Sequence, residues 1–263
     1  RTARTPRPEY SEYYTDKYSQ LLQKEKTPEI LYWDFTKNVS ETVKLQIKNL
    51  LTYILKTIKD REKSLNNYLL PLKYLLQYAE ESGLQDLLKM ELSQEEEYTA
   101  FLKASMGKSC GSQRRFITFC REILFMGNKE IDWSANVRYV DKLNIDPSRQ
   151  SQGNNIKSFN FCDVINIENR ATLQKYIKYL LTLTSLNIGT VKIFCCHAKA
   201  FLRYLEEQSM VISDINQETV NQYFSTLLLE QSPQSYNNKI RAVTDFLVYL
   251  QRVQIMDSFP IHV

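Results

Sequence analysis

Glycine and proline are scarce in this sequence, with six glycines and seven prolines in 263 residues. Sandwiches and barrels need turn residues between many short strands, so this scarcity favours helices. The sequence also lacks an apolar run near the ~18 residues of a membrane-spanning helix, and we expect no signal peptide. With 43% hydrophobic and 24% charged residues, the chain can nevertheless bury a core.

Residues that carry catalysis or bind metal are equally sparse. None of the five cysteines forms a C-x-x-C pair, which indicates reduced thiols in a cytoplasmic protein. The only histidines are His197 and His262. Cys195 and Cys196 precede His197, but consecutive residues point to different sides of a helix, so we expect no metal there. Phosphate-loop, dinucleotide-binding and nucleophile-elbow motifs are absent, and we identify no catalytic residue and no cofactor.

Amphipathic periodicity predicts an all-α fold with two groups of helices. Residues 1–39 form a polar, tyrosine-rich arm that contains several arginines, and residues 40–130 hold the first group. Ser40 suits the N-cap of the first helix, and Gly83 suits the end of the second. A capping box, Ser93 with Glu96, is expected at the start of the third helix.

The second group of helices is expected within residues 158–263. Residues 131–157 lack sustained periodicity, so we interpret them as an irregular linker. The helices beyond the linker are expected over residues 168–184, 188–208, 217–230 and 233–253. Asn187 and Asn216 are suitable N-caps, and Pro233 occupies a first helical position.

The two groups resemble one helical unit used twice. Similar stretches recur in three separate helices at a nearly constant separation, which chance matching of amphipathic helices explains less well. The matched residues are Tyr78 with Tyr204, Glu95 with Glu218, and Phe119 with Phe246, which lie 126, 123 and 127 positions apart.

Basic and amide residues gather at particular helices. The net charge of +4 is too small to indicate a nucleic-acid partner, so the placement of these residues must decide. Such groups suit contacts to phosphates and base edges, although ordinary solvated helix faces carry the same residues, and both interpretations stay open. The candidate DNA-binding residues are Thr190, Lys192, Lys199, Arg203, Ser235, Asn238, Lys239 and Arg241 in the second group, and Lys73, Gln113, Arg114, Arg115 and Arg121 in the first.

Residues 158–260 resemble the core-binding domain of tyrosine recombinases, the integrase family of bacteria and phages. The resemblance rests on the order of three stretches: "TLQKYIKYLLTLTSLNIGTVKIFCCHAKAFLRYLEEQ", "ISDINQETVNQYFSTLL" and "SPQSYNNKIRAVTDFLVYLQRVQIMDSFP". The lead-in "SFNFCDVINIENRATLQKYIKYLL" is similar to the longer recombinases called transposase A and transposase B. The first half of the chain is covered much more weakly.

This resemblance implies two tandem SAM-like bundles of four to five helices each. In the family, the second and fourth helices of the core-binding module face duplex DNA, and the module contacts sibling subunits in a synaptic complex. The family's catalytic arginines, lysine, histidine and tyrosine are not recognisable here, and "VQIMDSFP" is similar to the connector before the catalytic domain. We therefore expect a chain that binds DNA at element ends without cutting it and that is cut before the catalytic domain.

Two hypotheses from different classes follow. The first is DNA binding by the N-terminal part of a tyrosine recombinase or transposase, which positions a separate catalytic domain for integration or transposition. The second is a non-catalytic helical scaffold for protein–protein interaction, in which the basic residues only solvate the surface. The salt dependence of binding distinguishes the two, because a protein that grips phosphates loses affinity steeply as salt rises.

Overall fold

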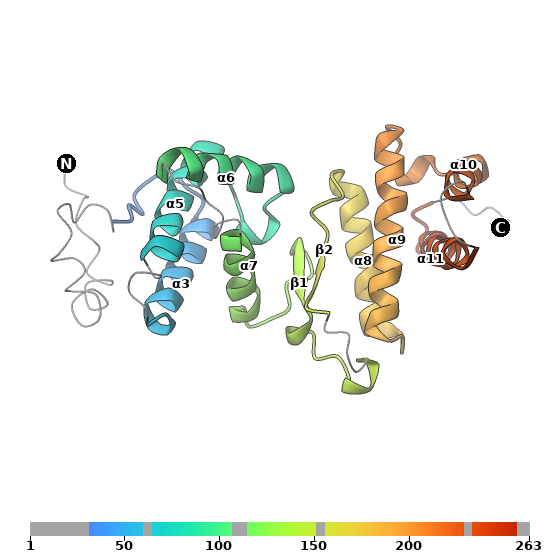
Figure 1. Cartoon of the computed structure of the whole chain (residues 1–263), viewed down its shortest axis with the longest axis horizontal. Coiled ribbons are helices and arrows are strands. Elements are labelled where there is room, and N and C mark those ends of the chain that lie inside the picture. The colour runs from blue at the N-terminus through green and yellow to red at the C-terminus, as the bar shows by residue number, and fades with distance from the viewer. Residues whose placement is uncertain (1–31, 60–64, 107–114, 151–155, 229–232, 257–263) are drawn as a thin grey trace. The chain divides into compact units, whose positions relative to one another are not determined.

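The computed structural model describes residues 32–59, 65–106, 115–150, 156–228 and 233–256. The fold is all-α, as the periodicity predicts: helices account for 71% of the structure, and the described residues form eight α-helices and one small two-stranded sheet. The chain divides into two compact units, Arg1–Glu130 and Ile131–Val263, whose elements Figure 1 labels. Each unit has its own buried core.

The first unit contains four α-helices in its described part. They are α3 (Glu41–Thr57), α5 (Leu70–Ser82), α6 (Leu92–Met106) and α7 (Phe116–Gly127), with a π-helical turn at Leu65–Leu69 and a 3-10 turn at Leu87–Lys89. The Ser40 side chain accepts a 3.2 Å hydrogen bond from the amide of Val43, which confirms the expected N-cap. Gly83 ends α5 at a φ of 67°, a left-handed conformation that glycine adopts without strain.

Helix α6 starts two residues earlier than the expected capping box allows. The helix begins at Leu92, so Ser93 lies inside its first turn and does not cap it. The side chain of Gln94 instead accepts a 3.0 Å hydrogen bond from the amide of Glu91. A side chain that reaches back to the residue before the helix satisfies one of the amides that have no partner within the helix.

The second unit contains the other four α-helices and the sheet. Its elements are β1 (Val137–Tyr139), β2 (Ser158–Asn160), α8 (Ile167–Leu183), α9 (Ile188–Glu207), α10 (Gln217–Leu228) and α11 (Pro233–Arg252), with 3-10 turns at Val140–Lys142, Pro147–Arg149 and Ile212–Asp214. Asn187 and Asn216 accept hydrogen bonds from amides in the first turns of α9 and α10, as expected. Helix α9 packs against both α8 and α11, and α10 packs against α11.

Residues 131–157, expected to form a linker, group with the second unit and are tied to its helices. Strand β1 pairs antiparallel with β2, and Arg138 lies opposite Phe159. The Arg138 side chain is 1% exposed and donates a 2.9 Å hydrogen bond to the carbonyl of Gln174 in α8. Arg149 donates to the carbonyls of Leu180, Leu181 and Leu186 at the end of α8, at 3.1, 2.7 and 2.8 Å. Periodicity gives no sign of these contacts because arginine side chains make them over more than 30 residues of sequence.

Each unit contains four α-helices in its described part, so the helices can be compared in chain order, α3 with α8 and so on to α7 with α11. Helices α3 and α8 both have 17 residues, and their first residues lie 126 positions apart. The Tyr78 ring contacts Tyr98 across α5 and α6, with centroids 5.6 Å apart. In the second unit, Tyr204 contacts Tyr223 across α9 and α10 at 5.1 Å. These two aromatic contacts match the hypothesis of one unit used twice, but the helix packing differs, because α3 packs against α7 in the first unit and α9 packs against α11 in the second.

Candidate nucleic-acid interface

Helix α9 contains two lysines and an arginine, and its only acidic residues, Glu206 and Glu207, stand at its end. From Ile188 to Leu205 it contains no acidic residue. One side of the helix is buried, with residues such as Val191, Ala198 and Leu202 at 0% exposure and at helical spacing. The polar side chains of α9 therefore lie on the opposite side of the helix, toward solvent.

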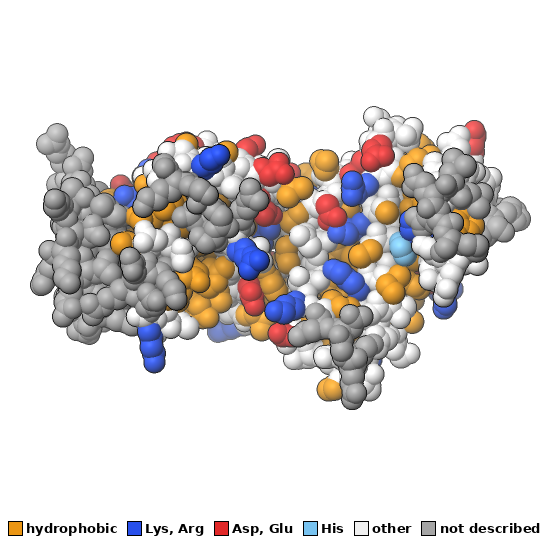
Figure 2. Space-filling view, viewed as in Figure 1, with side chains coloured by type: hydrophobic (Ala, Val, Ile, Leu, Met, Phe, Trp, Pro, Cys, Tyr) orange, Lys and Arg blue, Asp and Glu red, His pale blue; other side chains and the backbone are white. Residues whose placement is uncertain are grey.

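The solvent side of α9 combines basic and small residues. We call it the α9 face and define it by Gly189, Lys192, Ile193, Cys196, Ala200 and Arg203. These residues are exposed or half-buried, and their spacing places them along one side of the helix. Figure 2 shows Lys and Arg side chains lying among hydrophobic ones over β2, α8 and α9. A cationic surface with small side chains lets a helix approach a polyanion closely.

The two lysines of α9 already have oxygen partners. Lys192 donates a 3.0 Å hydrogen bond to the carbonyl of Ser158 and lies 5.4 Å from the centre of the Phe159 ring. Lys199 contacts both carboxylate oxygens of Asp163, at 2.7 and 2.6 Å, and the carbonyl of Asn160 at 3.1 Å. Both lysines therefore hold β2 and the following loop against α9. Arg203, by contrast, is exposed and forms no ion pair with any residue that the structure describes.

Lys239 of α11 lies on the α9 side of its helix. Burial and the nearby Lys239 ammonium lower the pKa of His197 in α9 below its usual value. His197 is half-buried, and α9 and α11 pack together, so the two groups lie near the junction of these helices. Lys239 thus extends the basic surface of α9 onto α11.

Arg241 does not join Lys239, although the two residues are close in sequence. Two positions along a helix turn a side chain to nearly the opposite side. Arg241 is exposed and lines a groove along α11 instead, to which α8 contributes Tyr179. The expected cluster at the start of α11 is therefore divided between two surfaces.

Arg121, expected to contact DNA, is a structural residue, which corrects that expectation. It is 2% exposed and forms an ion pair with Glu95. It also donates hydrogen bonds to the carbonyl of Met90 and, at 3.4 Å, to that of Leu87. A buried guanidinium whose donors point at protein oxygens cannot reach a phosphate. The sequence of α7 does not predict that Arg121 is buried, because its partners come from α6 and the turn before α6.

The remaining candidates are dispersed. Thr190 on α9 and Ser235 on α11 are half-buried, and Asn238 on α11 is exposed. In the first unit, Lys73 is half-buried on α5, and Arg115 is exposed directly before α7. Gln113 and Arg114 lie outside the described residues, as do His262 and Cys110.

Sequence reasoning missed the groove residues Tyr179, Asp245, Tyr249 and Arg252. A helical-wheel plot of α11 would have placed Asp245, Tyr249 and Arg252 beside Arg241, whereas Tyr179 comes from α8.

None of the described helices is both long and apolar enough to cross a membrane. Among the described residues, no three side chains of His, Cys, Asp or Glu gather in a way that would hold a metal ion. Searches against protein-family models, curated proteins and solved structures find no match to this chain.

Proposed function

We propose that this chain binds duplex DNA, and that the α9 face together with Lys239 is the contact surface in the second unit. The observation that carries the proposal is the charge of α9, which has two lysines and an arginine but no acidic residue from Ile188 to Leu205. A helix of that charge, with one exposed side, suits the width of a major groove. Phosphates beside the groove would attract the basic side chains.

Arg203 is the central residue of the proposed contact. Its guanidinium is exposed, and a planar group with five N–H donors matches phosphate oxygens or a guanine edge. Gly189, Cys196 and Ala200 leave the middle of the α9 face without bulky side chains. Ile193, half of whose surface is exposed, would contact sugar or a thymine methyl group.

The resemblance to the core-binding domain of tyrosine recombinases and transposases supports the same surface, because the second and fourth helices of that module correspond to α9 and α11. We therefore propose that the chain is the DNA-binding part of such a protein and acts at the ends of a mobile element in the cytoplasm, with sibling subunits as partners. The first unit, whose helices follow the same order, would grip DNA farther from the exchange point. We assign strand exchange to no residue of this chain.

The test is fluorescence anisotropy of the full chain with a labelled duplex oligonucleotide at increasing salt. We expect the logarithm of the association constant to fall linearly with the logarithm of the salt concentration. Arg203→Ala should weaken binding at every salt concentration and lower the slope by about 1. Lys175→Ala, on the solvent side of α8, removes the same charge and should leave the affinity unchanged.

The proposal fails if no duplex binds at low salt, or if Arg203→Ala and Lys175→Ala bind alike. The helical-scaffold alternative has its own supporting observation, because Ile167 and Leu183 at the two ends of α8 are 67% and 76% exposed. Exposed apolar side chains at such positions are typical of contacts with another protein. A chain that ignores DNA and self-associates through these residues would support that alternative.

A further inference from the structure

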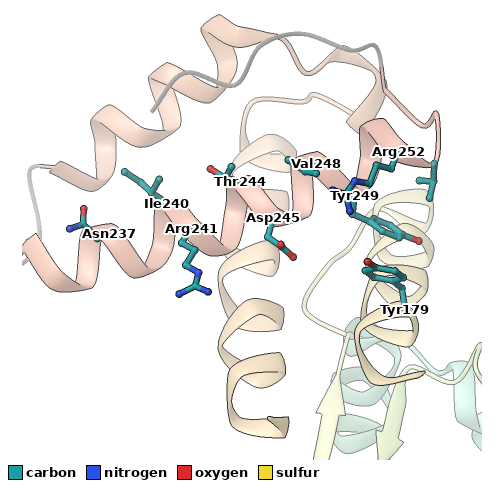
Figure 3. Close-up of a pocket in the computed structure, with 10 residues that line it drawn as sticks. Tyr179, Asn237, Ile240, Arg241, Thr244, Asp245, Val248, Tyr249 and Arg252 are labelled. Atoms are coloured by element: carbon teal, nitrogen blue, oxygen red, sulfur yellow. The ribbon is translucent and has the colours of Figure 1, made fainter. Parts of the chain in front are cut away.

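A groove of about 470 Å³ runs along α11, and Tyr179 of α8 also lines it. Figure 3 shows Arg241 and Asp245 projecting from the same side of α11, while Tyr249 lies beside Tyr179 of α8. Asn237, Arg241, Asp245 and Tyr249 are each four residues apart, so they form one row along the helix. The groove therefore presents an amide, a guanidinium, a carboxylate and a phenol in sequence.

Aromatic rings form one end of this groove. The ring centres of Tyr179 and Tyr249 lie 5.2 Å apart with 35° between their planes. Tyr249 also contacts Tyr176, at 5.1 Å, so the pair is supported from the core. Tyr179 and Tyr249 are both only half-buried. Part of each ring thus stays available to a flat ligand, and a supported ring loses little conformational freedom when one binds.

Two arginines provide positive charge on either side of Asp245 along α11. Arg241 and Arg252 are exposed, and neither forms an ion pair with a residue that the structure describes. Eleven residues separate them, which corresponds to about 16 Å along the helix. The two guanidinium groups are too far apart for one small anion, but they suit successive charges on an extended polyanion.

Asp245 adds a hydrogen-bond acceptor between the arginines. The Tyr176 hydroxyl donates to its Oδ2 atom at 2.7 Å, which fixes the carboxylate. No described side chain donates to its Oδ1 atom, which stays open to a ligand in the groove. A carboxylate repels phosphates but accepts hydrogen bonds from the exocyclic amino groups of adenine, cytosine and guanine. Thymine has no such amino group.

We propose that this groove binds single-stranded nucleic acid, with one unpaired base stacked on Tyr179 and Tyr249. Arg241 and Arg252 would contact phosphates on either side, and the Oδ1 atom of Asp245 would accept a hydrogen bond from an amino-bearing base. Stacking on aromatic side chains within a basic groove is the general way in which proteins hold single strands. The site goes beyond duplex binding and does not depend on the α9 face.

The test compares labelled octanucleotides of cytosine and of thymine by fluorescence anisotropy with the full chain. The cytosine strand should bind more tightly than the thymine strand. Tyr179→Ala should weaken binding of the cytosine strand about tenfold, because it removes the stacking surface. Tyr179→Phe keeps that surface and should bind like the unaltered chain. Arg203→Ala, on the α9 face, should leave single-strand binding unchanged even though it weakens duplex binding, which separates this proposal from the previous one.

Arg252→Ala provides a second variant, since this exposed residue is not part of the core. It should reduce the salt dependence of single-strand binding, where each phosphate contact contributes about 0.7 to the slope. The proposal is overturned if Tyr179→Ala and Arg252→Ala both bind the cytosine strand with unaltered affinity and salt dependence. It is equally overturned if an acidic, tyrosine-containing peptide occupies the groove and no octanucleotide displaces it.

Discussion

Tyr176 of α8 donates a 2.7 Å hydrogen bond to the Asp245 carboxylate of α11 and so joins two helices across 69 residues of sequence. Its ring is fully buried and lies 5.0 Å from Phe246. The hydroxyl thus ends a buried aromatic cluster at the edge of the groove. The bond holds a carboxylate and a tyrosine pair in one arrangement.

Tyr176→Phe should destabilise the second unit by about 1 kcal/mol, because the ring contacts remain and one hydrogen bond to a charged acceptor is lost. Urea denaturation measures the change in the free energy of unfolding. The matched control is Tyr204→Phe on α9, whose ring packs on Tyr223 and whose hydroxyl has no hydrogen-bond partner among the described residues. Equal stabilities of the two variants would contradict a role for the Tyr176 hydroxyl.

Arg121→Leu should destabilise the first unit by about 3 kcal/mol, because the Glu95 carboxylate and two carbonyls would lose their buried partner. Arg115→Leu, exposed before α7, should change the free energy of unfolding by less than about 0.5 kcal/mol. Thermal unfolding followed by circular dichroism distinguishes them. An Arg121→Leu chain with full stability but weakened DNA binding would restore Arg121 as a contact residue.

Arg149→Lys should destabilise the second unit by about 1–3 kcal/mol. A lysine cannot reproduce the three N–H groups that Arg149 directs at the carbonyls of Leu180, Leu181 and Leu186. Arg252→Lys, at an exposed position, is the control and should have almost no effect. Chemical denaturation measures both. A neutral result for Arg149→Lys would show that residues 131–157 do not depend on this contact.

The helices follow from sequence because their signals are local. The apolar stripe of α3, the Ser40 cap and the Gly83 stop all lie within a few residues of the helix that they define. The sheet could not be predicted from the sequence, since β1 and β2 have three residues each and are separated by 18 others. The prediction that Arg121 contacts DNA was wrong because its burial depends on α6. Only the tertiary structure brings α6 next to Arg121.

The same distinction applies to the candidate site. The basic residues of α9 are read directly from the sequence. The engagement of Lys199 with Asp163 depends on a loop 36 residues earlier and could not be predicted. The separation of Lys239 from Arg241 could have been predicted from the sequence, because helical geometry alone places residues two positions apart on different sides.

Stability should decrease as the pH rises above about 9. Burial raises the pKa of Tyr78 and of Tyr223 to about 12, and that of Cys195 to about 12, above the usual values of 10 and 9. The unfolded chain loses these protons first, so the folded chain holds more protons and stability falls with pH. Arg138, whose pKa burial lowers to about 10, opposes this trend above pH 10.

Urea denaturation at pH 7, 9, 10 and 11 measures this dependence. Tyr223→Phe should show a smaller loss of stability between pH 9 and 11 than the unaltered chain, because it removes one of the titrating groups. A free energy of unfolding that stays constant up to pH 11 would contradict the burial of these hydroxyls.

Cys196 should react with iodoacetamide in the folded chain, while Cys120 and Cys195 should not. Cys196 is exposed on the α9 face, whereas Cys120 and Cys195 are 0% and 1% exposed. Burial also raises the pKa of both buried thiols, which suppresses the reactive thiolate. Peptide mass spectrometry identifies the modified residues, and unfolding in urea should make all three reactive. Early modification of Cys195 would show that α9 is oriented differently.

The contacts of Lys192 and Lys199 with β2 and the loop after it reduce the binding free energy that these residues can contribute to a complex with a polyanion. An ammonium group that leaves Asp163 or the carbonyl of Ser158 for a phosphate exchanges one oxygen partner for another. Its net contribution is only the difference between the two interactions, whereas an exposed arginine contributes almost the whole of its own. Counting the lysines on a helix face therefore overestimates its affinity for a polyanion when those lysines already form hydrogen bonds or ion pairs within the protein.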